Sequence, residues 1–349
     1  SGAVYGFNRV SKFIALLAAR ATSLVVSGFY DDFAQLECRP LIENARTTFQ
    51  ELMDLLGFKV ATEERKNKPF SNKFEVLGVE LILDASTEGF ITIGPKPSRV
   101  VEVTELCREA VEKDKLVKSD AESLNNKIRF LREGYFGRCG ALALNRLQAH
   151  SMSPSASPLP GPLRVSLLWL CDFFSSAPPR TIKCRDSTTP VLLFTDGAAS
   201  EEGVTVGAVV LGDGVAPEAF GEFAPSRVAK SWRSGGDEQV IGQAELAPVA
   251  LSLRLWSERL RGKFVIAFID QDAARAGMVK AYSPSVANAE IIDLATQAAA
   301  SFNVFMWFTR VASASNIADL PSRMMWAELL ELIPNVIRRR LGTDAWASF

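Results

Sequence analysis

The chain has 349 residues, enough for two or three domains that each bury a sizeable core. A hydrophobic content of 48%, a charged content of 23% and a net charge of −1 describe an ordinary globular protein, so any basic surface for nucleic acid must be local. Five scattered cysteines without metal-site spacing fit a reducing compartment, and the single histidine, His150, leaves almost no room for zinc sites or histidine-based triads. No signal peptide is visible, and the apolar region 13–29 is too short to span a bilayer, so we expect an intracellular protein of the cytoplasm or nucleus with no membrane partner.

The first predicted elements are a helix and a hairpin. Apolar residues at helical spacing predict a helix over Val10–Ala21, and because the chain opens within an apparent element we expect a fragment of a longer protein. Two apolar runs then flank Phe29-Tyr30-Asp31-Asp32-Phe33 and predict a β-hairpin with two acids at its tip. Because adjacent carboxylates repel each other, a divalent cation such as Mg²⁺ would stabilise this tip. The alternative is a plain Asp-rich turn.

A helix, a basic loop and strands follow the hairpin. Glu43–Leu56 predicts an amphipathic helix that ends at Gly57, and Phe58–Val60 predicts a short strand. In the basic loop, Lys66 and Lys68 could contact phosphates, or they belong to a solvated run of charge.

The next predicted strands contain an unusual dipeptide. Phe74–Leu81 alternates as a strand, and Phe90–Ile93 supplies a return strand. Within the first of them, Leu77 and Gly78 would let another backbone approach closely, or they form a simple bulge.

From Ser98 the pattern becomes helical and the helices carry arginines. These side chains could follow the backbone of a duplex, or they form the charged outer face of a helical hairpin; they are Arg129, Arg132, Arg138 and Arg146. Residues 151–162 are rich in Ser and Pro and predict a linker or surface loop, followed by one short apolar helix over 163–174. We therefore place a domain boundary within 151–190.

The second half alternates strands and helices, and four acids fall at their ends. The pattern predicts a three-stranded meander, a long helix, and further alternating strands and helices over 191–198, 204–211, 219–223, 239–260, 264–270, 272–280, 286–301 and 304–308. Asp196 and Asp270 end buried strands, Glu245 lies near the start of the long helix, and Asp319 opens the last helix. Four such carboxylates could hold two Mg²⁺ ions about 4 Å apart and cleave a phosphodiester by two-metal catalysis.

Other residues near these acids have possible supporting roles. Asp272 is the rival of Asp270, but it follows the strand and fits a helix N-cap. Ser200 and Asn316 could orient the metal-binding carboxylates. Trp232 and Arg233, in the Gly-rich loop before Glu245, could contact nucleic acid or pack within the loop.

These motifs resemble the reverse transcriptase–ribonuclease H proteins of retrotransposons, and most closely those of DIRS-type elements. The hairpin resembles the Tyr-X-Asp-Asp signature of reverse transcriptases, with Phe29 in place of Tyr. The ribonuclease H resemblance is carried by Phe194–Ala198, Gln243–Leu246, Phe268–Asp270 and Asn316–Asp319, with the following Leu320-Pro321-Ser322-Arg323.

The resemblance implies an α+β and α/β chain of four parts. They are a partial reverse-transcriptase palm with a primer-grip hairpin (1–95), thumb or connection helices (96–150), a linker (151–190), and a ribonuclease H-like mixed sheet flanked by helices (191–349). It implies that Asp31 and Asp32 help to hold two Mg²⁺ in the complete polymerase site, and that two more lie at Asp196, Glu245, Asp270 and Asp319.

The resemblance also implies partners, namely an RNA template, a DNA primer and an RNA–DNA hybrid. The residues expected to contact them are Tyr30, Lys66, Lys68, Leu77, Gly78, Arg132, Trp232 and Arg233. The family uses a further polymerase carboxylate upstream of the hairpin, which is missing here, so we do not expect this chain to polymerise. The alternative is a decayed or domesticated retroelement remnant that binds nucleic acid without catalysis.

Overall fold

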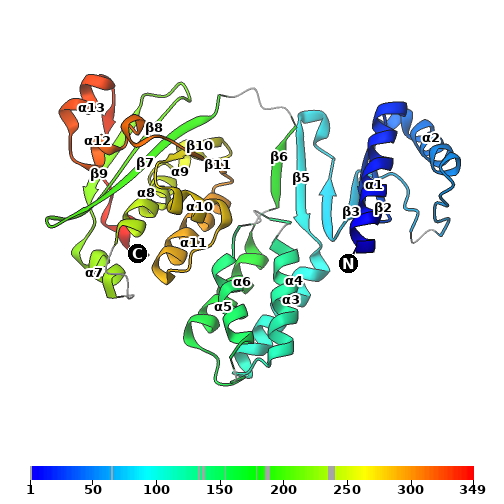
Figure 1. Cartoon of the computed structure of the whole chain (residues 1–349), viewed down its shortest axis with the longest axis horizontal. Coiled ribbons are helices and arrows are strands. Elements are labelled where there is room, and N and C mark those ends of the chain that lie inside the picture. The colour runs from blue at the N-terminus through cyan, green and yellow to red at the C-terminus, as the bar shows by residue number, and fades with distance from the viewer. Residues whose placement is uncertain are drawn as a thin grey trace. The chain divides into compact units, whose positions relative to one another are not determined.

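The computed structural model describes residues 2–63, 66–132, 134–135, 138–153, 155–177, 179–184, 189–234 and 240–349. The chain divides into two compact units, residues 1–76 and 77–349 (Figure 1). The predicted boundaries after residues 95, 150 and 190 differ from this division. None of the described helices has the length and apolar character needed to cross a membrane.

The first unit contains the predicted helix, hairpin and amphipathic helix. Its elements are α1 (Gly2–Thr22), β1 (Val25–Phe29), β2 (Asp32–Leu36), α2 (Ile42–Leu55) and β3 (Lys73–Val76). The strands β1 and β2 are antiparallel, and Phe29 pairs with Asp32 across a two-residue turn, which confirms the hairpin. Gly57 follows α2 with a φ of +78°, as expected for a helix C-terminus. Phe58–Val60 is irregular, so the strand predicted there is wrong.

The second unit begins with a turn rather than with the interior of a strand. Leu77 and Gly78 have φ angles of 49° and 75°, which is typical of the two-residue turns that join hairpin strands. The predicted strand over 74–81 is therefore interrupted, because neither φ angle fits a strand. A small antiparallel sheet follows, in which β5 pairs with both neighbours; its strands within the second unit are β4 (Val79–Ile82), β5 (Phe90–Pro95) and β6 (Arg180–Lys183).

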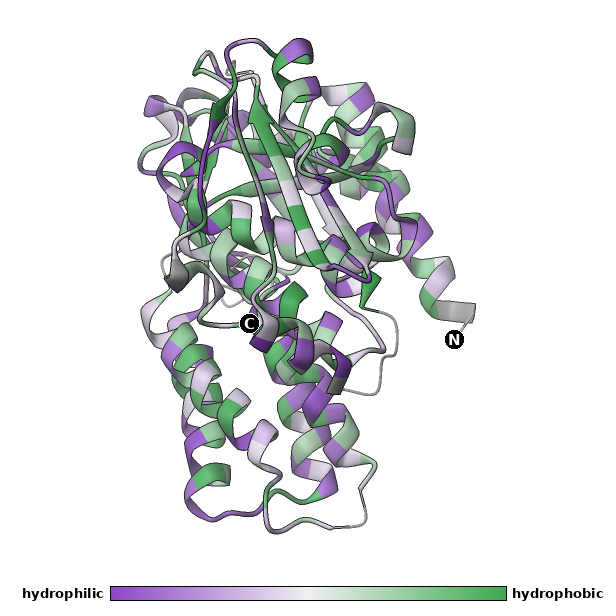
Figure 2. Ribbon diagram, turned by 90° about the vertical axis from the view of Figure 1, so that its left-hand side faces the viewer, coloured by the Kyte–Doolittle hydropathy of each residue, from purple (hydrophilic) through white to green (hydrophobic). Residues whose placement is uncertain are grey.

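Four helices form a bundle with its own core. They are α3 (Pro97–Glu112), α4 (Lys118–Arg132), α5 (Ala141–Ser151) and α6 (Gly161–Ser176). Figure 2 shows these helices with alternating hydrophobic and hydrophilic segments, as expected for helices that bury one face. Leu163, Leu167 and Leu170 of α6 lie fully inside this core. Residues 161–176 and 180–183 are therefore no linker, because α6 completes the bundle and β6 extends the small sheet.

The second half of the chain forms a six-stranded mixed sheet, so the chain is of the mixed α/β type. The strand order is β11-β10-β7-β8-β9-β12. The meander predicted for β7, β8 and β9 is confirmed, and β10 lies parallel to β7 and β11. The strands are β7 (Val191–Ser200), β8 (Gly203–Leu211), β9 (Glu218–Phe223), β10 (Phe264–Ile269), β11 (Phe305–Arg310) and β12 (Ile337–Arg338).

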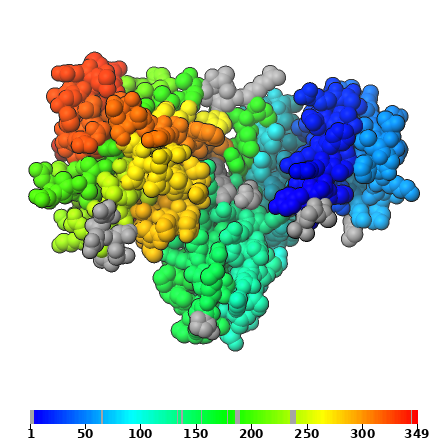
Figure 3. Space-filling model, in the orientation of Figure 1, coloured from blue at the N-terminus to red at the C-terminus, as the bar shows by residue number. Residues whose placement is uncertain are grey.

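Helices cover the two faces of this sheet unequally. One face carries the main core with α8 and α11, and α12 packs on β7, β8 and β9 from the other face. Figure 3 shows α10 and α11, in yellow to orange, packed together at the surface. The helices are α7 (Ser226–Ser234), α8 (Ile241–Leu255), α9 (Ser257–Leu260), α10 (Asp272–Lys280), α11 (Val286–Ser301), α12 (Asp319–Ser322) and α13 (Trp326–Leu332).

Three glycines bring these helices unusually close to the strands. A Cβ atom on Gly197 of β7 would lie 2.1 Å from the carbonyl oxygen of Ala244 in α8. On the opposite face, a Cβ on Gly207 would lie 2.4 Å from the backbone nitrogen of Ser322, and one on Gly221 would lie 2.0 Å from the carbonyl oxygen of Pro321. Only glycine permits these approaches, which place α8 and α12 directly against the middle of the sheet.

Candidate metal centre

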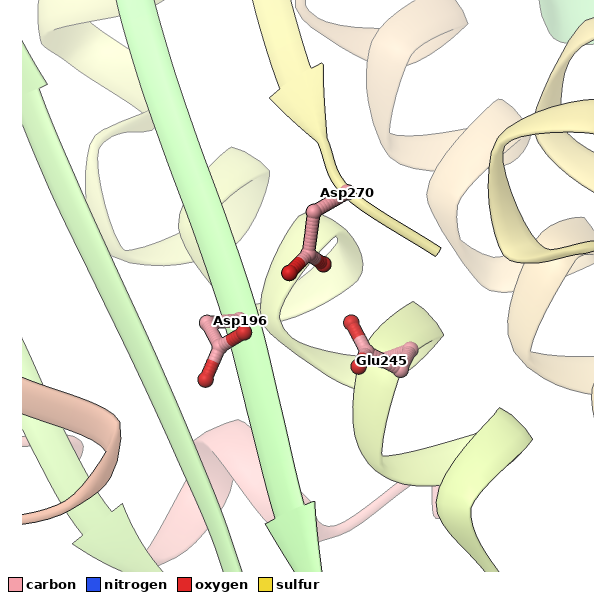
Figure 4. A group of neighbouring side chains, drawn as sticks. All are labelled: Asp196, Glu245 and Asp270. Atoms are coloured by element: carbon pink, nitrogen blue, oxygen red, sulfur yellow. The ribbon is translucent and has the colours of Figure 1, made fainter. Parts of the chain in front are cut away.

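Three predicted acids meet at one point of the large sheet. Asp196 lies within β7, Glu245 is the fifth residue of α8, and Asp270 directly follows β10 (Figure 4). Each carboxylate offers one oxygen atom, and these three atoms lie within 4.8 Å of one another. Asp196 and Glu245 are buried, and Asp270 is half-buried.

The local structure explains why the three acids meet. Phe194 and Phe268 pair in the parallel register of β7 and β10, so Asp196 and Asp270 reach the same level, each two residues further on. Gly197 lets α8 approach β7, and the Gly197 backbone N–H faces Glu245, which partly offsets the effect of burial on the pKa of that carboxyl. One detail of the prediction is wrong: Asp196 does not end its strand, because β7 continues to Ser200 in pairing with β8.

The electrostatics of this group favour a bound cation. Burial raises the pKa of Asp196 to about 6, opposed by its hydrogen bond with Ser322 and reinforced by the charges of Asp270 and Asp319. Burial also raises the pKa of Glu245 to about 9, and the charges of Asp196 and Asp270 add to this effect. Asp196 and Glu245 therefore both resist ionisation, which a divalent cation would reverse.

The donor atoms also fit a metal. Glu245 Oε2 and Asp270 Oδ1 are buried, and neither has a hydrogen-bond partner among the described residues. Buried polar atoms are normally satisfied, so two unpaired carboxylate oxygens in one cluster need an explanation. Oxygen-rich sites of this kind suit hard cations such as Mg²⁺.

The fourth predicted acid, Asp319, does not join the group of three. It is the first residue of α12, and its carboxylate forms an ion pair with Arg323 at 2.7 Å. Its charge nevertheless contributes to the raised pKa values of Asp196 and Glu245. Asp272 also lies outside the group. It is exposed and paired with Arg275 at 3.0 Å, which agrees with the preference for Asp270 as the metal-binding acid.

Two side chains from the segment around α12 hold Asp196 in place. Asn316, predicted for such a role, donates to the backbone oxygen of Thr195 at 3.1 Å and lies 3.5 Å from Asp196 Oδ1. The Ser322 hydroxyl donates to Asp196 Oδ2 at 2.5 Å, a contact that sequence reasoning missed. Ser200 instead bonds near its own turn, to the carbonyl oxygen of Gly203, so its predicted role is wrong.

A cavity of about 460 Å³ lies beside the carboxylates, between α8, α10 and the start of α11. Gln243, Gln271 and Asn288 contribute amide side chains to its lining, and Lys280 adds a positive charge. The side-chain oxygens of Gln271 and Asn288 are buried without a hydrogen-bond partner in the described part of the chain. The cavity therefore offers polar groups for a ligand next to Asp270.

The predicted polymerase residues lie in the first unit, at the hairpin and beyond it. Asp31 and Asp32 are exposed at the tip, where Tyr30 has a left-handed φ of 52° and accepts a hydrogen bond at its carbonyl from Ser11. Lys66 and Lys68 are exposed, which fits both interpretations, a contact with phosphates and a solvated run of charge. These roles stay predictions.

The predicted nucleic-acid contacts at Leu77, Gly78 and Arg132 lie in the second unit, and their roles stay predictions. At Gly78, a Cβ would lie 2.5 Å from the Phe130 ring and 2.8 Å from Arg99, so the close approach is made by the chain itself rather than left open for a primer. Arg132 ends α4 and is half-buried.

Trp232 requires a correction. It lies in α7, is 3% exposed and packs in the core of the large sheet near Phe349, so the prediction that it contacts nucleic acid is wrong. Arg233 beside it is exposed, and its role stays a prediction. The glycine-rich loop at 235–239 lies outside the described residues.

Neither protein-family models nor curated proteins match the chain. Ribonuclease H1 from the halophilic archaeon Halobacterium salinarum is similar over 40% of this chain and 98% of its own, with 16% identity and a TM-score of 0.30. The N-terminal ribonuclease H domain of a Mycobacterium tuberculosis protein, solved as a fusion with maltose-binding protein, is similar over 42% and 99%, with 16% identity and a TM-score of 0.29.

Proposed function

We propose that residues 191–349 form a ribonuclease H-like domain that hydrolyses the RNA strand of RNA–DNA hybrids with Mg²⁺. The observation that carries this proposal is the group of Asp196, Glu245 and Asp270, whose oxygens lie within 4.8 Å of one another where the parallel strands β7 and β10 meet α8. The strand order, with a meander followed by two parallel strands, supports it.

The residues around the candidate metal centre would have different roles in this reaction. Asp196, Glu245 and Asp270 would hold the cations, and Ser322 and Asn316 would fix the orientation of Asp196. Two Mg²⁺ ions at such a site would supply an activated water and stabilise the leaving oxygen. We propose Asp319 as a further metal ligand. Arg323, which forms an ion pair with the Asp319 carboxylate, would compete with the metal for it. The amides of Gln271 and Asn288 can both donate and accept hydrogen bonds, which suits the sugar hydroxyls of an RNA strand.

Cleavage of a labelled RNA strand in an RNA–DNA hybrid tests this function. With Mg²⁺ we expect the RNA to be cut, and Asp196→Asn to lower the rate more than about 100-fold, beyond the usual cost of losing a supporting contact. Asp272→Asn is the matched control, because it makes the same change in an exposed acid beside the site, and its rate should stay within about twofold. Binding of the hybrid without cleavage would instead favour the remnant that only binds nucleic acid.

We further propose that this domain belongs to a retroelement reverse transcriptase and that the first unit is part of its palm, engaging an RNA template and a DNA primer. The support is the hairpin, which presents the exposed acids Asp31 and Asp32 at its tip. Mn²⁺ binding at this turn, detected by paramagnetic broadening of nearby signals, should disappear in the double variant Asp31→Asn, Asp32→Asn. A plain Asp-rich turn would show no such difference.

A further inference from the structure

The large sheet has an aromatic surface on the face opposite α8 and α11. Along β10, Val265, Ala267 and Ile269 belong to the main core, so the alternating side chains of Phe264, Ile266 and Phe268 point to the other face. On β11, Phe308 belongs to the main core while Trp307 is 71% exposed. We call the side chains of Phe194, Phe264, Phe268, Phe305 and Trp307 the aromatic face.

The rings of the aromatic face follow one another across three strands. Phe264 and Phe305 stack at 5.0 Å, and Phe268 stacks on Phe194 at 4.4 Å with a 7° angle between the rings. Trp307 pairs in register with Ile266, which lies between Phe264 and Phe268 on the same side of the sheet. The guanidinium of Arg180 lies 5.0 Å from the centre of the Phe305 ring and places a positive charge at this end.

The aromatic face leads to the carboxylates. Asp196 is two residues beyond Phe194 and points to the same side of β7, because Ser322 of α12 reaches it from that side. From Phe264 to Asp270 the chain runs six residues, about 20 Å of extended strand. A strand of nucleic acid held at the metal centre can therefore continue over this surface.

We propose that the aromatic face is a platform for single-stranded nucleic acid, the RNA strand that extends beyond the hybrid. This inference rests on the proposed function, since that function brings RNA to Asp196. The exposed rings of Trp307 and Phe264, continued by the half-buried rings of Phe305, Phe268 and Phe194 and bordered by a guanidinium, match the flat faces of bases and the charge of phosphates. Trp307 is the most exposed residue of the aromatic face, so it should contribute the largest single stacking contact.

Binding of a fluorescein-labelled single-stranded RNA of about 12 nucleotides, measured by anisotropy without divalent cations, tests the platform. Trp307→Ala in the full chain should weaken binding about fivefold or more, and Trp307→Phe, which keeps a ring, should restore most of the affinity. Phe223→Ala is the matched control, because Phe223 is also an exposed aromatic residue and lies at the end of β9 outside the aromatic face. Cleavage of a blunt RNA–DNA hybrid should not change in Trp307→Ala.

Equal affinity of the wild-type chain and Trp307→Ala for the RNA would overturn the platform. Loss of self-association in Trp307→Ala, with RNA binding intact, would overturn it in favour of an interface between two copies. Failure of the nuclease is distinguishable, because a chain that cuts no hybrid can still bind single-stranded RNA through Trp307. Equal melting temperatures of the variants exclude misfolding as the cause.

Discussion

At the scale of single residues, the candidate centre is defined by unpaired acceptors. Glu245 and Asp270 each bury an oxygen without a donor among the described residues, and Asp196 is held by the hydroxyl of Ser322. This arrangement costs stability without a cation, because buried carboxylates of like charge repel. We therefore expect metal binding, folding and protonation to be coupled at this site.

Removal of the Ser322 hydroxyl should impair catalysis without removing a ligand. We expect Ser322→Ala to lower metal affinity or the cleavage rate about 10- to 100-fold, because Asp196 loses the partner that orients it. Cleavage rates measured over a range of Mg²⁺ concentrations check this, and part of the loss should recover at high Mg²⁺. Wild-type rates at every Mg²⁺ concentration would show that Ser322 does not position Asp196.

The stability of the metal-free chain should fall as the pH rises. Folding raises the pKa of Asp196 from its ordinary value of 3.8 to about 6, and that of Glu245 from 4.5 to about 9. Below their ordinary pKa values both carboxyls are protonated in the folded and in the unfolded chain, so their burial carries no penalty for ionisation and the stability is fully present. This stability is lost as the pH rises through the two raised pKa values. Melting temperatures in EDTA between pH 5 and 9 should show this fall.

Two comparisons isolate the contribution of the site to this fall. Glu245→Gln should flatten the pH dependence, because the amide cannot ionise. Added Mg²⁺ should reduce the fall, because a cation stabilises the ionised carboxylates. The same slope in the wild-type chain and in Glu245→Gln would assign the pH dependence to other groups.

At the scale of elements, close contacts through glycine position the site. The approach of α8 to β7 at Gly197 brings Glu245 to Asp196, and the approach of α12 to β8 at Gly207 brings Ser322 to the same carboxylate. Such contacts tolerate no added methyl group, because backbone atoms rather than flexible side chains occupy the space. The position of the site therefore depends on these glycines as well as on its acids.

The substitution Gly197→Ala should destabilise the second unit by about 1–3 kcal/mol and reduce cleavage, since α8 must move away from β7. Chemical denaturation and the hybrid assay measure the two effects. Gly161→Ala is the matched control, because nothing lies within 4 Å of its added Cβ. An equal, small effect of both substitutions would contradict the close packing of α8.

The sequence predicted elements best where a periodic pattern spans the whole element. The predicted ranges 272–280 and 286–301 agree with α10 and α11 residue for residue. Trp232 was misplaced because α7 packs into the core through tertiary contacts that its short sequence does not reveal. The roles of Ser322 and Asp319 also depend on tertiary structure, since the four-residue helix α12 decides which side chain reaches Asp196 and which pairs with Arg323.

At the scale of the whole molecule, the domain boundaries were the least predictable feature. Ser- and Pro-rich composition near 151–162 indicated a linker, but α6 returns to the bundle and β6 to the small sheet. The bundle is also tied to α11 within the second unit, where Arg146 pairs with Glu290 at 3.0 Å and Cys139 donates to the carbonyl of Thr296. Composition indicates only local properties of the chain. These contacts join residues about 150 positions apart, so composition could not predict them.

A crystal structure of the full chain grown with Mn²⁺, a substitute for Mg²⁺ that is visible by anomalous scattering, tests the central claim most directly. The account predicts a peak about 2.1 Å from carboxylate oxygens of Asp196, Glu245 and Asp270, and its loss in Asp196→Asn. Anomalous maps without a peak at these three residues, from crystals that contain Mn²⁺ elsewhere or in excess, would contradict it.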